Sequence, residues 1–538
     1  MAQGKSTPAA TKERIEERIP VAVAKTGINA YATDVVSNYQ ALISNGIVEN
    51  YSNDDSRYYV TQRPSLNIFR EASNDVADVY GRGIHYWSSN SNLYWMNDDV
   101  IYKGSYSTPC SVQGGDTAIA SGSSQVHFRE WSSANADYLF IFDSQNAGIY
   151  CICSDADTTV INILDRTTSG TGGTNGFATG DDYDFSPLVS IIGTDGLCEG
   201  AVVLDTYLFL GTTTSARIYN SDADNWLQWD ALNFTTAERD NDELLSIEKT
   251  QDHLAAFGAR TIELFYDNAN ATGSPLSVRT DVAHQIGTAF RQSTWSNGDD
   301  IYFLGVRPGG EFVMATLRNF QVEEHRNNTY NSFLWMARYT ENLTIQMGGF
   351  SVGGHVYAIM TMFDGLTSVK SVVYDAAYDY WYEWSTTIGT NTNFVVMGYT
   401  YRDWNDDNRP SGILRTGDIF YINGDYTCVD SISQVGNTET ENITMTIITD
   451  DYDYNSTENK YMVAANYVGN QTAATQTMTV YWYDEDAATE YSRTIDTSYR
   501  GQINRMGRFV KRKFKFVYAG TEQLRFEGLD VVFTLGNY

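Results

Sequence analysis

One pattern recurs along most of this chain and limits what it can fold into: two short apolar runs separated by a polar turn. Residues 93–96, for example, turn at Asn97-Asp98 into the apolar run 100–102. Seven such hairpins begin at Leu93, Tyr138, Tyr207, Leu254, Ile301, Val356 and Ile413, at spacings of 45 to 69 residues. Repeats of about 40–50 residues are typical of β-propeller blades, whereas β-helix repeats are much shorter. The spacing predicts a propeller of six or seven blades, six if the two end hairpins share one closing blade.

The composition favours an all-β fold. The chain has 38 Tyr, 24 Phe and 11 Trp, residues that suit a half-buried pleated surface. It has 8 Pro against 43 Gly, as expected for long sheets joined by glycine turns, because proline cannot donate a hydrogen bond to a sheet. We therefore expect helices only near the N-terminus.

The repeat divides the chain into three parts. Residues 1–60 lack it and are expected to form an irregular or helical N-terminal arm and lead-in segment, with short helices over 12–19 and 30–46. Residues 61–430 are expected to form the propeller. Beyond residue 430 the theme changes, and Ile443, Met445 and Ile447 alternate with threonines. This alternation predicts a separate C-terminal β domain over 431–538.

The charge balance excludes most nucleic-acid-binding functions. The formal net charge is −31 and the pI is about 4.4. Proteins gain affinity for nucleic acid by neutralising phosphates with Lys and Arg, and this chain as a whole repels them. We expect no export signal and no membrane span, because no apolar run is long enough. Five irregularly spaced cysteines argue against a disulfide framework and fit a reducing cytoplasm.

No motif for catalysis, cofactor or metal binding is complete. Asp451-x-Asp453-x-Asn455 begins like a calcium loop, but Ser456 and Met462 stand where glycine and glutamate are needed. The six histidines show no metal-ligand spacing, and no serine or cysteine nucleophile motif is present. We expect no catalytic residue, no cofactor and no metal, although carboxylate pairs for glycoside cleavage depend on the fold and stay open.

A basic strip near the C-terminus is the clearest electrostatic feature. Seven cations and no acid lie between Arg500 and Lys515. In a strand, Lys511, Lys513 and Lys515 point one way while Phe514, Phe516 and Tyr518 point the other. The strip is either a solvated strand face, an edge protected by lysines, or a docking surface for an acidic partner. Our candidate interface residues are Arg505, Arg508, Lys511, Lys513 and Lys515.

Three stretches of the chain form recognisable motifs. The first is Arg63-Pro-Ser-Leu-Asn-Ile-Phe69 with residues 81–87 and 93–104; the second is Phe257-Gly-Ala-Arg-Thr-Ile-Glu-Leu-Phe-Tyr266 with Ile286-Gly287 and residues 300–305; the third is Tyr481-Trp-Tyr-Asp-Glu-Asp486 with Arg505-Met-Gly-Arg508. These stretches resemble the tail-tube or tail-nozzle proteins of short-tailed bacteriophages, including those called packaged-DNA stabilisation proteins. The motifs are short and together touch most of residues 60–538. The chain departs from the family at Ala487-Ala488, where glycines tend to follow the acidic turn.

The resemblance implies a virion tail protein, a propeller subunit in a sixfold ring below the portal and adaptor. Its implied partners are other copies of itself, the adaptor ring, tail fibres or spikes, and DNA that passes without sequence-specific binding. Assembly in the bacterial host cytoplasm would follow. Two other functions stay open: a propeller enzyme that cleaves glycans, with converging carboxylates in a pocket, and a module that binds carbohydrate or a receptor through aromatic loops.

Overall fold

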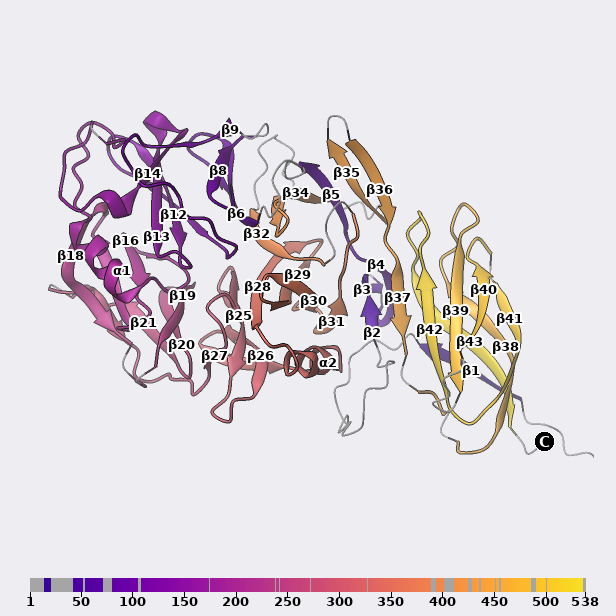
Figure 1. Ribbon diagram of the computed structural model, residues 1–538. Helices are drawn as coiled ribbons and strands as arrows, with labels where there is room; N and C mark the ends of the chain where they lie inside the picture. Colours follow the sequence, from indigo (N-terminus) through magenta and orange to yellow (C-terminus); the bar gives the residue numbers. More distant parts are fainter. Residues whose placement is uncertain are drawn as a thin grey trace, which may run out of the picture.

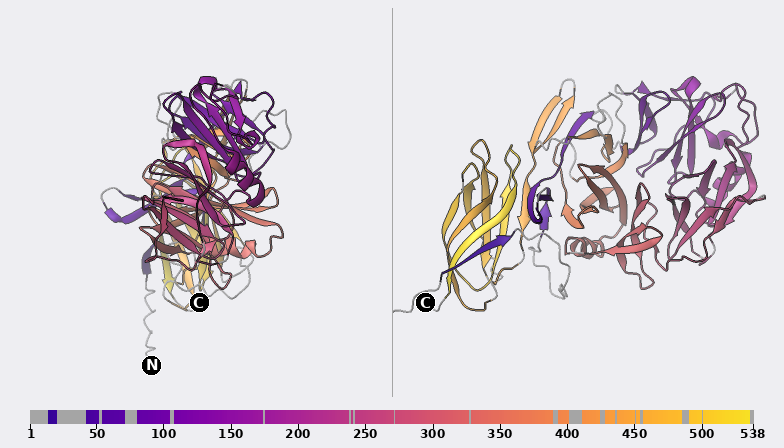
Figure 2. Two further views of the ribbon diagram at one scale, coloured as in Figure 1. Left: turned by 90° about the vertical axis from the view of Figure 1, so that its left-hand side faces the viewer. Right: turned by 180° about the vertical axis from the view of Figure 1, so that it is seen from behind.

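A computed structural model describes residues 14–20 and 42–535 apart from 52–53, 71–79, 105–107, 174, 238, 241, 271, 327, 389–392, 401–410, 424–427, 435–436, 450, 454–455, 485–489 and 500. Most of the helix expected over 30–46, the turn at Ala487-Ala488, and Arg500 lie outside these residues. The described part consists of a propeller beside a β-sandwich (Figure 1), and the same arrangement is seen from behind in Figure 2. No described helix is long and apolar enough to cross a membrane.

The first four blades follow one another along the chain. Blade 1 holds β6 (Gly81–Trp87), β7 (Asn92–Asn97), β8 (Val100–Lys103) and β9 (Thr108–Pro109). Blade 2 holds β11 (His127–Ser132), β12 (Asp137–Asp143), β13 (Gly148–Cys153) and β14 (Thr159–Asn162), with β10 (Ser111–Val112) outside β14. Blade 3 holds β15 (Val202–Leu204), β16 (Tyr207–Gly211), β17 (Arg217–Asp222) and β18 (Asn225–Thr236). Blade 4 holds β19 (Leu244–Thr250), β20 (His253–Gly258), β21 (Ile262–Asp267) and β22 (Leu276–Val278).

The last three blades complete the ring. In blade 5, β23 (Gly287–Thr288) and β24 (Thr294–Asn297) pair with β25 (Asp300–Val306), followed by β26 (Phe312–Arg318) and β27 (Gln321–His325). Blade 6 holds β28 (Leu343–Val352), β29 (His355–Asp364), β30 (Thr367–Asp375) and β31 (Tyr380–Glu383). Blade 7 holds β32 (Val396–Thr400), β33 (Ser411–Leu414) and β34 (Ile419–Asn423), and its fourth strand is β5 (Ser65–Arg70) from the other end of the propeller sequence. The expectation of helices only near the N-terminus is wrong, because the described helices lie within the propeller sequence: α1 (Ser186–Asp195), α2 (Asn328–Ala337), η1 (Ser154–Ala156) and η2 (Ile163–Asp165).

The described sheets therefore confirm a propeller, and they count seven blades. Strand β6 of blade 1 contacts both β11 of blade 2 and β32 of blade 7, so the blades form a closed ring. Each of the seven hairpins lies in a blade of its own, and the alternative with one shared closing blade is wrong. The hairpin strands have continuous apolar runs because both faces of a blade pack on neighbouring blades; β13, for instance, is buried at every position.

The sandwich joins strands from both ends of the chain. One sheet orders β3 (Gly46–Tyr51), β4 (Asp54–Gln62), β43 (Phe526–Leu535), β38 (Lys460–Gly469) and β41 (Gln502–Phe509), with β1 (Arg14–Pro20) also on β43. The other orders β2 (Leu42–Ser44), β37 (Met445–Ile448), β42 (Arg512–Tyr518), β39 (Thr477–Asp484) and β40 (Tyr491–Asp496), and β2 also pairs with β31 of blade 6. A hairpin of β35 (Val429–Gln434) and β36 (Asn437–Asn442) extends blade 7 beyond β5.

The helix expected over residues 12–19 is wrong. Residues Arg14–Pro20 form strand β1, which pairs antiparallel with β43 from Arg14 opposite Thr534 to Pro20 opposite Gly528. Pairing with β43 provides hydrogen-bond partners that two isolated helical turns cannot match, because such short helices are marginal alone. Strand β2 likewise occupies Leu42–Ser44, inside the second expected helix.

Candidate functional site

The basic strip does not form one surface. Strands β41 and β42 belong to the two different sheets of the sandwich, and the chain crosses between the sheets around Lys511. Ile503, Met506 and Phe509 of β41 and Phe514, Phe516 and Tyr518 of β42 face the same core. Arg505 and Arg508 therefore lie on the outer face of one sheet, and Lys513 and Lys515 lie on the opposite outer face.

The three lysines already have acidic partners. Lys511 Nζ and Lys513 Nζ lie 3.3 and 3.8 Å from the carboxylate of Asp451, and Lys515 Nζ lies 4.0 Å from that of Glu490. The expected alternation is confirmed, since Phe514, Phe516 and Tyr518 are buried while Lys513 and Lys515 are half-buried. The edge-strand interpretation is wrong for the lysines, because β42 lies between β37 and β39, whereas β41 is the last strand of its described sheet. Little positive charge is left on this face for a partner.

Arg512, in the middle of the strip, belongs to the core. Its guanidinium is fully buried and bonds both carboxylate oxygens of Asp484, at 2.6 and 2.9 Å. It also donates to the Met506 carbonyl at 2.8 Å and lies 4.2 Å from the centre of the Phe509 ring. The alternation that points the lysines outward also places Arg512 inward, so this role was readable from the sequence.

Arg505 and Arg508 are exposed and unneutralised. Among the described residues neither contacts a carboxylate; Arg508 Nε donates to Asn459 Oδ1 at 2.9 Å. Arg508 stands opposite Tyr461 of β38, and Arg505 lies at a bulge opposite Val463, with a backbone φ of 60°. Tyr461 and Val463 are 39% and 38% exposed. We call Tyr461, Val463, Arg505 and Arg508 the β41 arginine surface.

The centre of the propeller is bridged by the link that precedes blade 2. Gln125 Nε2 donates to the Met347 carbonyl on the innermost strand of blade 6, at 3.2 Å. Ser123 and Ser124 accept hydrogen bonds from Arg415 of blade 7 and Arg82 of blade 1, at 2.8 and 2.9 Å. No sequence pattern marked this link, because its partners in blades 6 and 7 lie more than 200 residues further along the chain.

Two buried carboxylates connect neighbouring blades: Glu199, just before β15 of blade 3, and Glu248, on β19 of blade 4. Glu199 bonds His127 Nε2 at 2.7 Å and accepts from Ser144 Oγ. Glu248 accepts from Ser296 Oγ at 3.2 Å, and burial raises the pKa of Glu248. Glu199 and Glu248 are 2% and 5% exposed, so neither carboxylate is open to a polymeric substrate.

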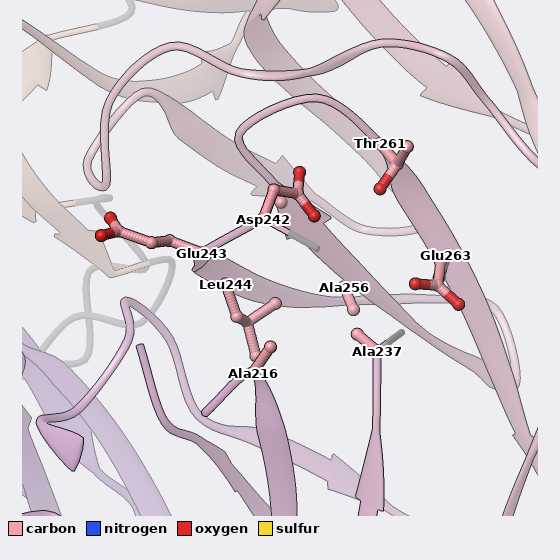
Figure 3. A pocket seen from close by; sticks show the side chains of 9 residues that line it. Ala216, Ala237, Asp242, Glu243, Leu244, Ala256, Thr261 and Glu263 are labelled. Atoms are coloured by element: carbon pink, nitrogen blue, oxygen red, sulfur yellow. The ribbon is translucent and has the colours of Figure 1, made fainter. Parts of the chain in front are cut away.

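A small hollow between blades 3 and 4 carries further acidic groups (Figure 3). The Asp242 carboxylate accepts from the Arg260 backbone at 2.7 Å, and Glu263 accepts from the Arg239 backbone at 2.9 Å. Burial raises the pKa of Asp242. These carboxylates hold backbone amides rather than converge on one point. The described residues include no group of three or more His, Cys, Asp or Glu that could hold a metal ion.

Residues 172–377 match the family model of the phage stabilisation proteins, described as "Bacteriophage P22 Gp10, beta-propeller". The matched range extends from the loop before α1 through β30, and thus covers most of blades 3 to 6. This match supports a structural role in a phage tail. None of the curated proteins matches the chain.

Several solved structures are similar in arrangement at very low identity. The extracellular domain of a hybrid two-component system from B. thetaiotaomicron is 8% identical with a TM-score of 0.41, over 84% of this chain and 56% of that one. The chain thus spans little more than half the length of that structure. The Nup133 β-propeller of Vanderwaltozyma polyspora is 10% identical with a TM-score of 0.32, over 68% and 97%. An exo-β-1,3-galactanase from Phanerochaete chrysosporium is 9% identical with a TM-score of 0.26, over 79% and 98%.

Proposed function

We propose that this chain is the subunit of a ring-shaped nozzle in a short phage tail, below the portal and adaptor, which retains packaged DNA and conducts it on ejection. The observation that carries the proposal is the match of residues 172–377 to the P22 Gp10 propeller family. Six copies, a podovirus-type tail, and contacts with the adaptor ring and with tail fibres or spikes are part of the proposal.

In this proposal the DNA passes between copies of the chain and not through a propeller. The bridge from Gln125 to Met347 across the propeller centre supports this, because it leaves no room for a duplex. The net charge of −31 supports it as well. Each phosphate that a wall neutralises adds affinity through counterion release, so an acidic lumen lets DNA slide without binding.

The β41 arginine surface is our candidate for docking an acidic neighbour. Opposite charges steer association and fix the register of an interface, even where each exposed pair adds only about 0–1 kcal/mol. The absence of an acidic partner within the described chain supports this choice for Arg505 and Arg508. Lys511, Lys513 and Lys515 are secondary candidates, since Asp451 and Glu490 already offset their charge.

We further propose that the chain is not an enzyme. A glycosidase needs two accessible carboxyl groups about 5–10 Å apart. Burial and hydrogen bonding of Glu199 and Glu248 support a structural role for both. Turnover of host capsule or lipopolysaccharide by the purified protein, lost in E199Q or E248Q, would overturn this part.

Native mass spectrometry and negative-stain imaging of the full chain test the proposed ring. We expect closed rings of six copies with a central opening, at about 0.15 M salt, where the Debye length of about 8 Å still permits contact between neighbouring charges. A chain that stays monomeric at tens of micromolar, alone and with adaptor rings, would contradict the nozzle function.

A further inference from the structure

The edge of strand β36 is unpaired in the described structure. β36 is the last strand of its sheet and pairs only with β35 among the described strands. Residues 438–442 are exposed, and the side chains of Glu439 and Glu441 make no hydrogen bond or ion pair with the described part of the chain. An edge strand with open backbone groups readily meets another chain.

The β36 edge and the β41 arginine surface cannot meet within one chain. In Figure 1, the β35–β36 hairpin stands between the propeller and the sandwich, whereas β41 lies on the side of the sandwich away from the propeller. Asn442 Nδ2 donates to the Ala519 carbonyl at 3.0 Å and so holds the end of β36 to the sandwich. Two unneutralised acids and two unneutralised arginines are thus held on opposite sides of the sandwich.

We propose that the β41 arginine surface of one copy binds the β36 edge of the next, with Arg505 and Arg508 facing Glu439 and Glu441. The proposal rests on the proposed ring and specifies which surfaces of neighbouring copies touch in it. A surface that meets a different surface on an identical neighbour makes a head-to-tail contact, which generates closed rings when the rotation closes. Tyr461 and Val463 add exposed apolar surface beside the charges. This surface can contribute to binding, whereas surface ion pairs alone contribute little.

Charge reversal on each side tests the contact. The variants are R505E/R508E, E439R/E441R, and a quadruple variant that carries all four changes, with R493E and E341R as matched controls at exposed sites. Native mass spectrometry should show that each double variant loses at least 90% of its rings. The quadruple variant should regain rings, because both charges are exchanged together. An equimolar mixture of the two double variants should also form rings, with the variants alternating.

Circular dichroism and thermal unfolding confirm that each variant stays folded, since all four positions are exposed. Rings from both double variants as abundant as those of the wild type would overturn the contact and leave the nozzle function standing. If both double variants fail but neither the quadruple variant nor the mixture recovers, the two surfaces do not face each other. A wild-type chain that forms no rings would overturn the nozzle function itself, and the contact with it.

Discussion

Arg63 and Asp430, 367 residues apart in the sequence, form a buried ion pair in which Nη1 and Nη2 bond the two carboxylate oxygens at 2.9 and 2.5 Å. Their side chains are 1% and 5% exposed. Asp430 lies on β35, and Arg63 lies in the link between β4 of the sandwich and β5 of blade 7. The same carboxylate accepts from the Leu66 amide and from Thr386 Oγ1, so one residue ties the propeller closure to the sandwich.

The first prediction concerns this pair. D430A leaves the guanidinium of Arg63 buried without its partner, which costs about 3–5 kcal/mol. Urea unfolding should show that loss of unfolding free energy. E341A, at an exposed acid, should change it by less than about 0.5 kcal/mol. A loss below about 1 kcal/mol in D430A would show that water or another group replaces the pair.

The second prediction is a dependence of stability on alkaline pH. His355 is buried between Asp375 on β30 and Glu49 on β3, at 2.6 and 3.2 Å, with the Tyr357 and Tyr378 rings beside it. Burial alone lowers the pKa of His355, but the bonds to Asp375 and Glu49 outweigh it and raise the pKa to about 9. The folded pKa exceeds the unfolded value, so the stabilisation is complete below about pH 6.5 and is lost as pH rises through 9.

Unfolding free energies of the wild type and H355Q at several pH values measure how much protonated His355 stabilises the fold. The difference between them should shrink by on the order of 2–3 kcal/mol between pH 6.5 and 9.5. The comparison isolates His355, because Asp375, Glu49 and the surrounding tyrosines remain in both proteins. Parallel pH profiles for the two proteins would mean that His355 is neutral in the folded state.

The third prediction concerns the contact between blades 4 and 5. A Cβ on Gly287 would lie 2.2–2.3 Å from backbone atoms of Gly258, Ala259 and Arg260. G287A must push two blades apart and should cost about 1–3 kcal/mol or more. Gly309, whose Cβ would meet nothing within 4 Å, is the control, and G309A should be neutral. Equal melting temperatures for the two variants would contradict this close approach.

The fourth prediction is that charge reversal on the two faces of the basic strip changes the free energy of unfolding by different amounts. K513E/K515E places new carboxylates beside Asp451 and Glu490, so two weak attractions become repulsions and the sandwich loses about 1–2 kcal/mol. R505E/R508E removes no ion pair and should stay within about 0.5 kcal/mol of the wild type. Chemical unfolding of both variants at low salt tests this; a larger loss in R505E/R508E would mean that these arginines stabilise the fold.

The propeller could be predicted from the sequence because both faces of each blade are buried. Burial on both faces leaves uninterrupted apolar runs such as residues 138–142, and their spacing is the spacing of the blades. The division of the basic strip could not be predicted, because adjacent strands β41 and β42 belong to different sheets, and their partners come from distant segments. Strand β1 was missed for the same reason, since its structure depends on β43 at the other end of the chain.

Strand β5 is synthesised before every blade that it helps to enclose. Arg70 of β5 stands opposite Ile419 of β34, which follows it by about 350 residues in the chain. At a translation rate of about 5–20 residues per second, roughly 20–70 s pass before β34 leaves the ribosome. During that interval the backbone hydrogen-bonding groups that β5 later presents to β34 have no partner strand, because no nearby segment supplies one. The ring closes last with the propeller strand that is synthesised first, so cotranslational folding must tolerate an unpaired strand edge until residue 423 has left the ribosome.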